Sequence, residues 1–156
     1  MVAVADWAAD RGDAVLITLG LGSCVAVALY DAEARVGGLA HILLPSQSLA
    51  RDRDKPAKFP ETAVPFLVAR MGELGAAPHR LRAWLVGGAS MFASTASGSV
   101  ASVGERNTQS TRDALASAGI PVAAGDTGKD YGRSVYFFLE TGRVEVRSYA
   151  HGTRIL

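Results

Sequence analysis

Apolar and polar residues are arranged along the chain in short blocks that predict strands more often than helices. Two blocks separated by glycines, Ala14–Leu19 and Cys24–Tyr30, predict buried strands, because strands covered on both faces have continuous apolar sequences. A third strand is expected over Gly37–Leu44, where Pro45 ends the pattern.

Two later segments have the spacing of amphipathic helices. A helix is expected over Glu61–Gly75, with apolar residues three or four apart at Val64, Leu67, Val68, Met71 and Leu74. A second helix is expected over residues 105–119, with Asn107 or Thr108 as the N-cap and Gly119 as the stop.

The remaining blocks add more strands. One is expected over Leu81–Val86, a short one after Pro121, and a closing hairpin over residues 133–149 that turns at Thr141-Gly142. Many strands with two helices predict an α+β protein in which a layered β core carries helices on one side. No linker or repeat divides the chain, so a single domain over residues 1–156 is expected.

The uncharged run Ala14–Tyr30 must be distinguished from a membrane span. Its 17 residues are at the lower limit of a span, and Gly20 and Gly22 interrupt it. Aspartates rather than basic anchors flank it, at positions 13 and 31. Two strands around a glycine-rich turn explain the run better.

Composition limits the classes of function. A net charge of +1 gives no electrostatic signature of a nucleic-acid or membrane-surface partner. A single cysteine can form no internal disulfide, and the N-terminal residues lack a signal-peptide pattern. The cytoplasm is therefore the expected location.

That one cysteine, Cys24, follows a turn that is suited to chemistry. Gly20 and Gly22 give the backbone freedom to turn sharply and to direct successive N–H groups toward one point, where an oxyanion can bind. A thiol beside such donors meets the requirement of acyl transfer through a tetrahedral intermediate.

A base for this thiol is expected from the next strand. If Asp31–Ala34 is the loop of a hairpin, Tyr30 faces Arg35 and Cys24 faces His41 on one side of the sheet. A slip of one residue would separate the two side chains.

Two further properties follow from this pairing. An imidazolium beside the sulfur would depress the pKa of Cys24. Thr18, at the end of the preceding strand, is placed to hold the His41 ring through its hydroxyl or carbonyl, which completes a triad-like chain.

Simpler interpretations remain open at this point. A lone cysteine in an apolar run is usually a small buried hydrophobe, and His41 is also consistent with a core histidine. His79 and His151 lack metal-ligand spacing with the cysteine, so no metal is expected. Gly20-Leu21-Gly22 is a weak match to a dinucleotide-binding fingerprint, because neither the third glycine nor a helix follows.

Taken together, six motifs resemble the CheD family, the chemoreceptor glutamine deamidases of bacterial and archaeal chemotaxis. In order they are TLGLGSCVAVALYD, GGLAHILLP, GGASMF, GERN, GIPV and GRSVYF. The resemblance covers nearly the whole chain. It implies a three-layer α/β/β sandwich, similar to the deamidating bacterial cytotoxins, with mainly antiparallel strands and two helices on one side.

The resemblance also implies roles for residues. Cys24 matches the nucleophile, His41 the general base and Thr18 the third site residue, while N–H groups around Gly22 and Ser23 would hold the oxyanion. The implied activity is that of a cysteine-dependent protein-glutamine glutaminase that forms a thioester, needs no cofactor and has a methyl-esterase side activity in some members.

The implied partners are the cytoplasmic domains of methyl-accepting chemotaxis receptors and the phosphatase CheC, without nucleic acid or membrane insertion. One departure from the family is that Gly128 is followed by Lys129, where a glycine pair is common. Two alternatives remain: a non-catalytic adaptor that binds receptors or CheC, and a cysteine amidohydrolase with another substrate.

Overall fold

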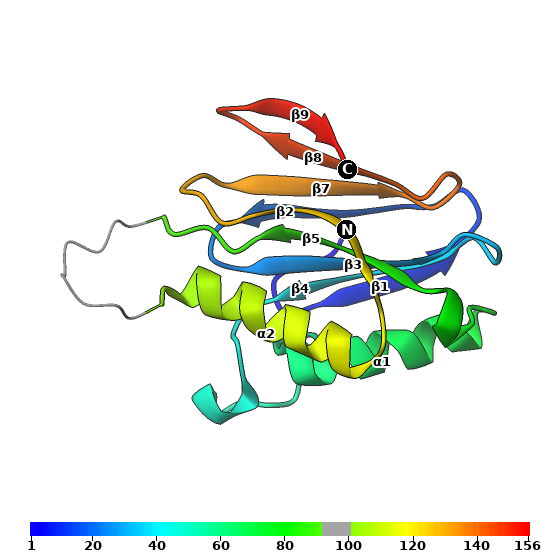
Figure 1. Ribbon diagram of the computed structural model, residues 1–156, viewed down its shortest axis with the longest axis horizontal. Coiled ribbons are helices and arrows are strands. Elements are labelled where there is room, and N and C mark those ends of the chain that lie inside the picture. The colour runs from blue at the N-terminus through cyan, green and yellow to red at the C-terminus, as the bar shows by residue number, and fades with distance from the viewer. Residues whose placement is uncertain (92–100) are drawn as a thin grey trace.

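Two helices and two β-sheets are stacked in the order helices, sheet, sheet (Figure 1). The structure, a computed structural model, describes residues 1–91 and 101–156. The five-stranded middle sheet has the order β1-β4-β3-β5-β6, with β1 at Trp7–Arg11, β4 at Val36–Ile42, β3 at Val25–Asp31, β5 at Arg82–Gly87 and β6 at Val122–Thr127. The four-stranded outer sheet has the order β2-β7-β8-β9, with β2 at Val15–Leu21, β7 at Arg133–Phe138, β8 at Arg143–Ser148 and β9 at Gly152–Ile155.

Helices α1 (Pro60–Glu73) and α2 (Val103–Ser117) form the third layer, on one face of the middle sheet. Among the described residues, three short 3₁₀ helices lie at Gln47–Leu49, Pro56–Lys58 and Pro78–Arg80. The α+β class and the α/β/β layering predicted above are confirmed, and only the β5–β6 pair is parallel among the strands described.

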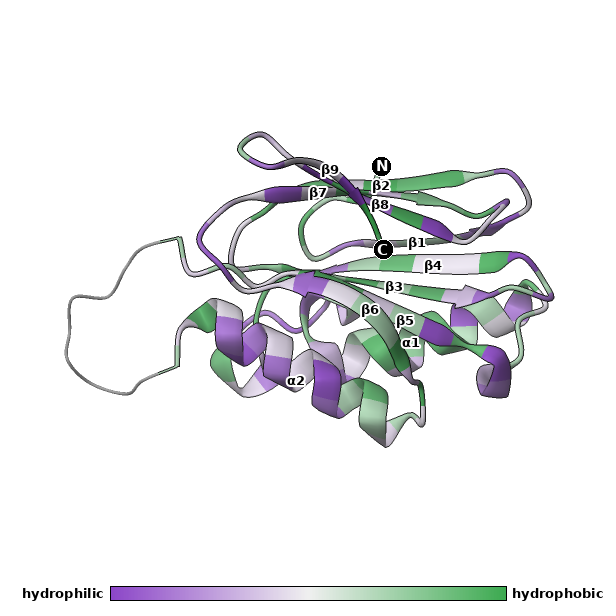
Figure 2. Cartoon of the chain, turned by 45° about the horizontal axis from the view of Figure 1, so that its top comes forward, coloured by the Kyte–Doolittle hydropathy of each residue, from purple (hydrophilic) through white to green (hydrophobic). Residues whose placement is uncertain are grey.

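Two apolar cores separate the three layers. Every residue of β3 is buried, because this central strand contacts the helices on one face and the outer sheet on the other. Its valines and leucine pack under the helices, whereas Ala26, Ala28 and Tyr30 face the outer sheet. Figure 2 shows β3 as mainly hydrophobic, while α2 is hydrophilic on its exposed side. This double burial explains the continuous apolar sequence.

The glycine-rich turn connects two different sheets. β2 belongs to the outer sheet and β3 to the middle sheet, so the chain crosses between layers at residues 22–24. Just before the crossing, the pairing of β2 with β7 shifts between Thr18 and Leu21, and Gly20 has a φ of 69°, as a bulge requires. No helix in the described part of the chain is long and apolar enough to cross a membrane.

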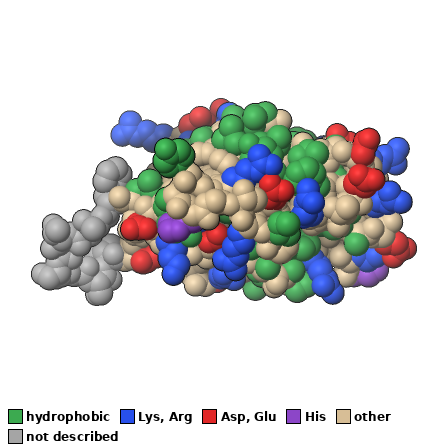
Figure 3. All heavy atoms as spheres, turned by 90° about the horizontal axis from the view of Figure 1, so that it is seen from above, with side chains coloured by type: hydrophobic (Ala, Val, Ile, Leu, Met, Phe, Trp, Pro, Cys, Tyr) green, Lys and Arg blue, Asp and Glu red, His purple; other side chains and the backbone are tan. Residues whose placement is uncertain are grey.

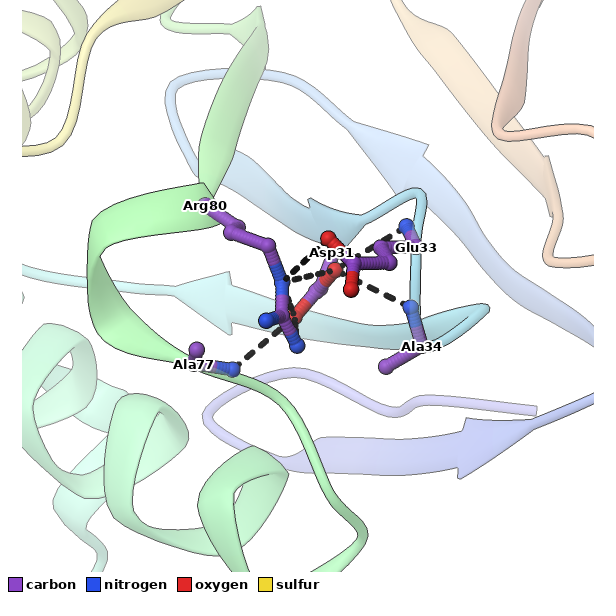
Figure 4. A network of polar contacts seen from close by, with 5 residues as sticks. All are labelled: Asp31, Glu33, Ala34, Ala77 and Arg80. Atoms are coloured by element: carbon purple, nitrogen blue, oxygen red, sulfur yellow. Dashed lines mark hydrogen bonds and ion pairs between the residues drawn. The ribbon is translucent and has the colours of Figure 1, made fainter.

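The register of the β3–β4 hairpin differs from the predicted one by two residues. Ala26, not Cys24, is the partner of His41, and Asp31 pairs with Val36. The reason lies in the Asp31 carboxylate, which accepts the N–H groups of residues 33 and 34 and so begins the turn one residue later (Figure 4). Arg35 closes the turn with a φ of 50°.

Asp31 also anchors this turn to a distant segment. Its fully buried carboxylate accepts hydrogen bonds from Arg80 Nε at 2.9 Å and from Ala77 N at 2.9 Å, and it pairs with Arg80 Nη2 at 2.9 Å (Figure 4). These donors lower the pKa of Asp31 to about 2, although burial alone would raise it.

The ends of the helices also differ from expectation. α1 begins at Pro60 and continues through Pro65, while α2 is capped by Ser102, whose hydroxyl accepts Glu105 N at 3.2 Å. The predicted N-cap at Asn107 or Thr108 is therefore wrong. The stop at Gly119 is confirmed by its φ of 69°.

Two strands were not predicted. β1 and β9 are both short edge strands whose sequences carry no clear apolar alternation. The closing hairpin is present as β7 and β8, with its turn glycine, Gly142, at a φ of 75°.

The outer sheet leaves one face to solvent. Arginine side chains lie over its aromatic rings, Arg143 above Phe138 at 4.3 Å and Arg147 above Tyr136 at 3.7 Å. Apolar and charged side chains are accordingly interspersed on this face (Figure 3). The site described next lies between the two sheets.

Candidate active site

Thr18 and His41 meet across the space between the two sheets. Both side chains are fully buried, and Thr18 Oγ1 lies 2.8 Å from His41 Nδ1. The same hydroxyl donates its proton to the Val2 carbonyl oxygen at 2.8 Å. Because a hydroxyl has one proton and a carbonyl can only accept, Oγ1 must accept from Nδ1–H.

This hydrogen bond fixes the tautomer of the histidine. A neutral ring that carries its proton on Nδ1 has a free lone pair on Nε2. His41 Nε2 is buried and has no partner among the described residues. Burial lowers the pKa of His41 to about 4, so the ring is neutral near pH 7. His41 is thus prepared to accept a proton at Nε2.

Cys24 lies at the edge of the same space. It precedes β3, is partly buried, and packs against the cluster between the sheets that includes Ala26. Cys24 lies one residue before the ladder, and it packs on the face that holds Ala26, the direct partner of His41. The two-residue change in register therefore preserves the alternation of faces but removes the direct pairing of Cys24 with His41.

The predicted depression of the Cys24 pKa is wrong. Burial raises the pKa of the thiol, and its own backbone N–H lowers it by less. The expectation assumed an imidazolium, but the buried His41 ring is neutral. The resting pair is therefore a thiol and a neutral imidazole.

The carbonyl groups of the turn are all held from outside it. Ala89 N donates to Gly22 O at 2.9 Å, and Gly88 N donates to Cys24 O at 2.8 Å. Asn107 Nδ2 donates to Ser23 O at 2.8 Å.

The N–H groups of the same turn have no such partners. Within residues 1–91 and 101–156, the N–H groups of Gly22, Ser23 and Cys24 donate to no carbonyl or side chain of another residue. Since C=O and N–H point in opposite directions across a trans peptide, the held carbonyls of Gly22 and Ser23 fix the directions of the Ser23 and Cys24 N–H groups. The turn can therefore present oriented N–H groups to an anion.

Two neighbouring segments support the turn. A Cβ on Gly87 would lie 2.3 Å from Cys24 O, so only glycine fits there. The loop after β6 bonds to the same region, through Gly128 N to Gly87 O at 2.9 Å and Ser90 N to Lys129 O at 2.8 Å. Lys129 has a φ of 64°, a left-handed conformation that glycine would adopt more easily. The loop thus adopts a left-handed conformation at Lys129, the position where the family commonly has a second glycine.

Two hollows of the surface differ in whether they reach this site. One of about 270 Å³ opens beside Ser23 and is bordered by Met91 and Ser102. A larger one of about 530 Å³ lies between the two helices and includes none of the five predicted site residues. In the described ranges, no group of three or more His, Cys, Asp or Glu side chains is arranged to hold a metal ion.

Sequence reasoning missed two contributors to the site. Val2 supplies the carbonyl that fixes the Thr18 proton, and nothing in its local sequence indicates this contact. Asn107 holds the Ser23 carbonyl, and its place in the GERN motif was the available signal, although we interpreted this residue as a cap.

Comparisons with known proteins all give the same family. The family model described as "CheD chemotactic sensory transduction" matches residues 43–148, a segment that begins after Thr18, Cys24 and His41. Full-length relatives extend the similarity over these three residues. The chain is 41% identical over 155 residues to "Probable chemoreceptor glutamine deamidase CheD" of Caldanaerobacter subterraneus, covering 99% of this chain and 96% of that one.

Two further relatives carry the same name. The protein of Moorella thermoacetica is 44% identical over 156 residues, with 99% of this chain and 93% of the relative covered. The protein of Pyrococcus abyssi is 41% identical over 151 residues, with 97% and 92% covered. The similarity therefore extends across bacteria and archaea at nearly full length.

Proposed function

The chain belongs to the CheD family, and on that premise we propose that it is a cysteine-dependent protein-glutamine deamidase. Its substrates are glutamine side chains in the cytoplasmic domains of methyl-accepting chemotaxis receptors, which it converts to glutamate with release of ammonia. The observation that carries the proposal is the Thr18–His41 hydrogen bond, which leaves His41 Nε2 free on the face of the sheet that Cys24 shares.

The first half of the reaction forms a thioester. Cys24 Sγ attacks the carbon of the substrate carboxamide while His41 Nε2 takes the thiol proton. The negative charge that develops on the carboxamide oxygen is stabilised by the N–H groups of Gly22, Ser23 and Cys24. His41 then gives the proton to the leaving nitrogen, and ammonia departs.

The second half regenerates the enzyme. His41 takes a proton from water as the water oxygen attacks the thioester carbon. The second tetrahedral intermediate collapses, the carbon–sulfur bond breaks, and the proton returns to Sγ. Glutamate leaves, so one water is consumed for each ammonia released.

A neutral resting pair suits this sequence of steps. Because the pKa of Cys24 is raised and that of His41 is lowered, proton transfer accompanies the attack instead of preceding it. Thr18 supports the transfer, since its hydroxyl oxygen accepts from Nδ1–H and stabilises the imidazolium that forms.

Two finer assignments belong to the same proposal. We place the protein in the cytoplasm, where the signalling domains of the receptors are found. We also propose the phosphatase CheC as a regulatory partner, because the family resemblance implies it. Binding of purified CheC, measured by calorimetry, tests this assignment independently of activity.

The direct test is conversion of a receptor fragment from the same organism. We expect each modified glutamine to gain about one mass unit and to release one ammonia, and we expect Cys24→Ala to abolish both. Equal turnover by Cys24→Ala would refute the cysteine mechanism. Receptor binding without turnover would favour the adaptor, and turnover of another amide alone would favour a different amidohydrolase.

A further inference from the structure

A buried asparagine on α2 joins the segment that carries Cys24 to the segment that carries His41. Asn107 is fully buried, and its Nδ2 donates to Ser23 O at 2.8 Å and to Leu43 O at 3.1 Å. Ser23 immediately precedes Cys24, and Leu43 lies two residues after His41. One side chain therefore contacts both halves of the site.

The two acceptors determine which amide atom faces them. Both Ser23 O and Leu43 O are backbone carbonyl oxygens, which accept hydrogen bonds and cannot donate. Only the NH₂ group of Asn107 can satisfy them together, because it carries two hydrogens on one planar nitrogen.

The contacts occupy the place where strand pairing ends. The β3–β4 ladder extends to the pair Val25 and Ile42. Ser23 and Leu43 lie just beyond it, so their carbonyls have left the ladder. Asn107 supplies a donor to both of these carbonyls outside the ladder.

Helix α2 is held closely enough to make this contact specific. A Cβ on Gly104 would lie 2.4 Å from Ala89 O, so the first turn of α2 packs directly on the backbone after β5. Asn107 is three residues further on, on the same buried side of the helix. Small changes in its side chain cannot be absorbed by a shift of the helix toward the sheet.

We infer that Asn107 is a positioning residue that aims the Cys24 N–H at the oxyanion of the reaction, an inference that rests on the function proposed above. Ser23 C=O and Cys24 N–H belong to one planar peptide, and they point in opposite directions. Holding Ser23 O toward α2 therefore turns the Cys24 N–H away from α2. Asn107 acts through this peptide and does not contact the substrate.

The test compares Asn107→Ala and Asn107→Asp with a matched control. Alanine leaves the two carbonyls without a donor, and aspartate places carboxylate oxygens against them. Thr111→Val is the control, because Thr111 is also fully buried on α2 but its hydroxyl donates only to Asn107 O within the helix, at 2.7 Å. Thermal melts establish that each variant is folded at the assay temperature.

Turnover of a receptor fragment and alkylation of Cys24 by iodoacetamide are measured for each protein. We expect kcat to fall at least about tenfold in both Asn107 variants with KM within about twofold, because an oriented donor acts on the transition state. Alkylation of the Cys24 thiol passes through no oxyanion, so the alkylation rate of each variant should stay within about threefold of the wild-type rate. Thr111→Val should retain wild-type kcat.

Each outcome decides a defined point. Wild-type kcat in Asn107→Ala, or an equal loss in Thr111→Val, would overturn the positioning role and leave the proposed function intact. A wild-type protein without turnover would instead contradict the proposed function. In that case the amide resonance of Cys24 decides: displacement by Asn107→Ala but not by Thr111→Val supports the inference, and an unchanged resonance overturns it.

Discussion

The neutral state of His41 predicts how stability depends on pH. Burial lowers its pKa from the ordinary 6.5 to about 4. Between these values the unfolded chain binds a proton that the native protein excludes, so the free energy of unfolding falls as the pH falls. The stabilisation is fully present above about pH 6.5 and is lost toward about pH 4, with a total of about 3 kcal/mol.

The assay is urea unfolding followed by tryptophan fluorescence, at about pH 7 and about pH 4.5. Over that interval we expect the wild-type protein to lose about 2 kcal/mol through this residue. His41→Asn is the matched variant, because its amide NH₂ can still donate to Thr18 while it does not titrate. Asp31 contributes little over this interval, since the stability it supplies is lost mainly as the pH falls from its ordinary pKa of 3.8 toward about 2.

The difference between the two proteins isolates the histidine. His41→Asn should be less stable than wild type near pH 7, but its free energy of unfolding should fall by about 2 kcal/mol less than that of wild type between about pH 7 and about pH 4.5. Parallel pH dependence in the two proteins would refute the buried neutral histidine, and with it the assignment of Nε2 as the free base.

Other predictions follow from separate contacts. Thr18→Val should keep the fold but lower kcat by about tenfold or more, because the ring loses the acceptor that fixes its tautomer; an unchanged kcat would contradict this role. Asp31→Asn should lose about 2 kcal/mol of stability near pH 7 in urea unfolding, a loss that should vanish toward about pH 2, whereas a pH-independent loss would contradict it. Gly87→Ala should reduce turnover strongly, because its Cβ would lie 2.3 Å from Cys24 O, while Gly119→Ala, with open space around its Cβ, should keep wild-type kcat and so serve as the control. The iodoacetamide reaction of Cys24 should have a pH midpoint above the ordinary thiol value of about 8.5, and a midpoint below it would contradict the neutral pair.

Sequence reasoning succeeded where local patterns determine the outcome. The apolar run around Cys24 is continuous because β3 is buried between helices and sheet, and that burial is visible in composition. Face assignments also survived an error in register, since a shift of two residues keeps Cys24 and His41 on the same side.

Sequence reasoning failed where contacts between distant segments determine the structure. The hairpin register depends on Asp31 accepting N–H groups within its own turn and on Arg80, which lies 49 residues away. The expected thiolate failed for a related reason, because the protonation state of His41 is set by burial between two sheets whose stacking no local pattern reveals. Asn107 was misjudged because an asparagine near a helix start usually caps it.

The central claim is that Cys24 forms a thioester with the substrate, and trapping that intermediate tests it most directly. Turnover of a receptor fragment is stopped with acid, and the peptide that contains Cys24 is analysed by mass spectrometry. The account predicts an adduct on Cys24 equal to the substrate peptide minus one ammonia, which hydroxylamine removes and which Cys24→Ala lacks. Two results together would contradict it: Cys24→Ala converts glutamine at the wild-type rate, and no adduct forms on Cys24 of the wild-type protein at any time.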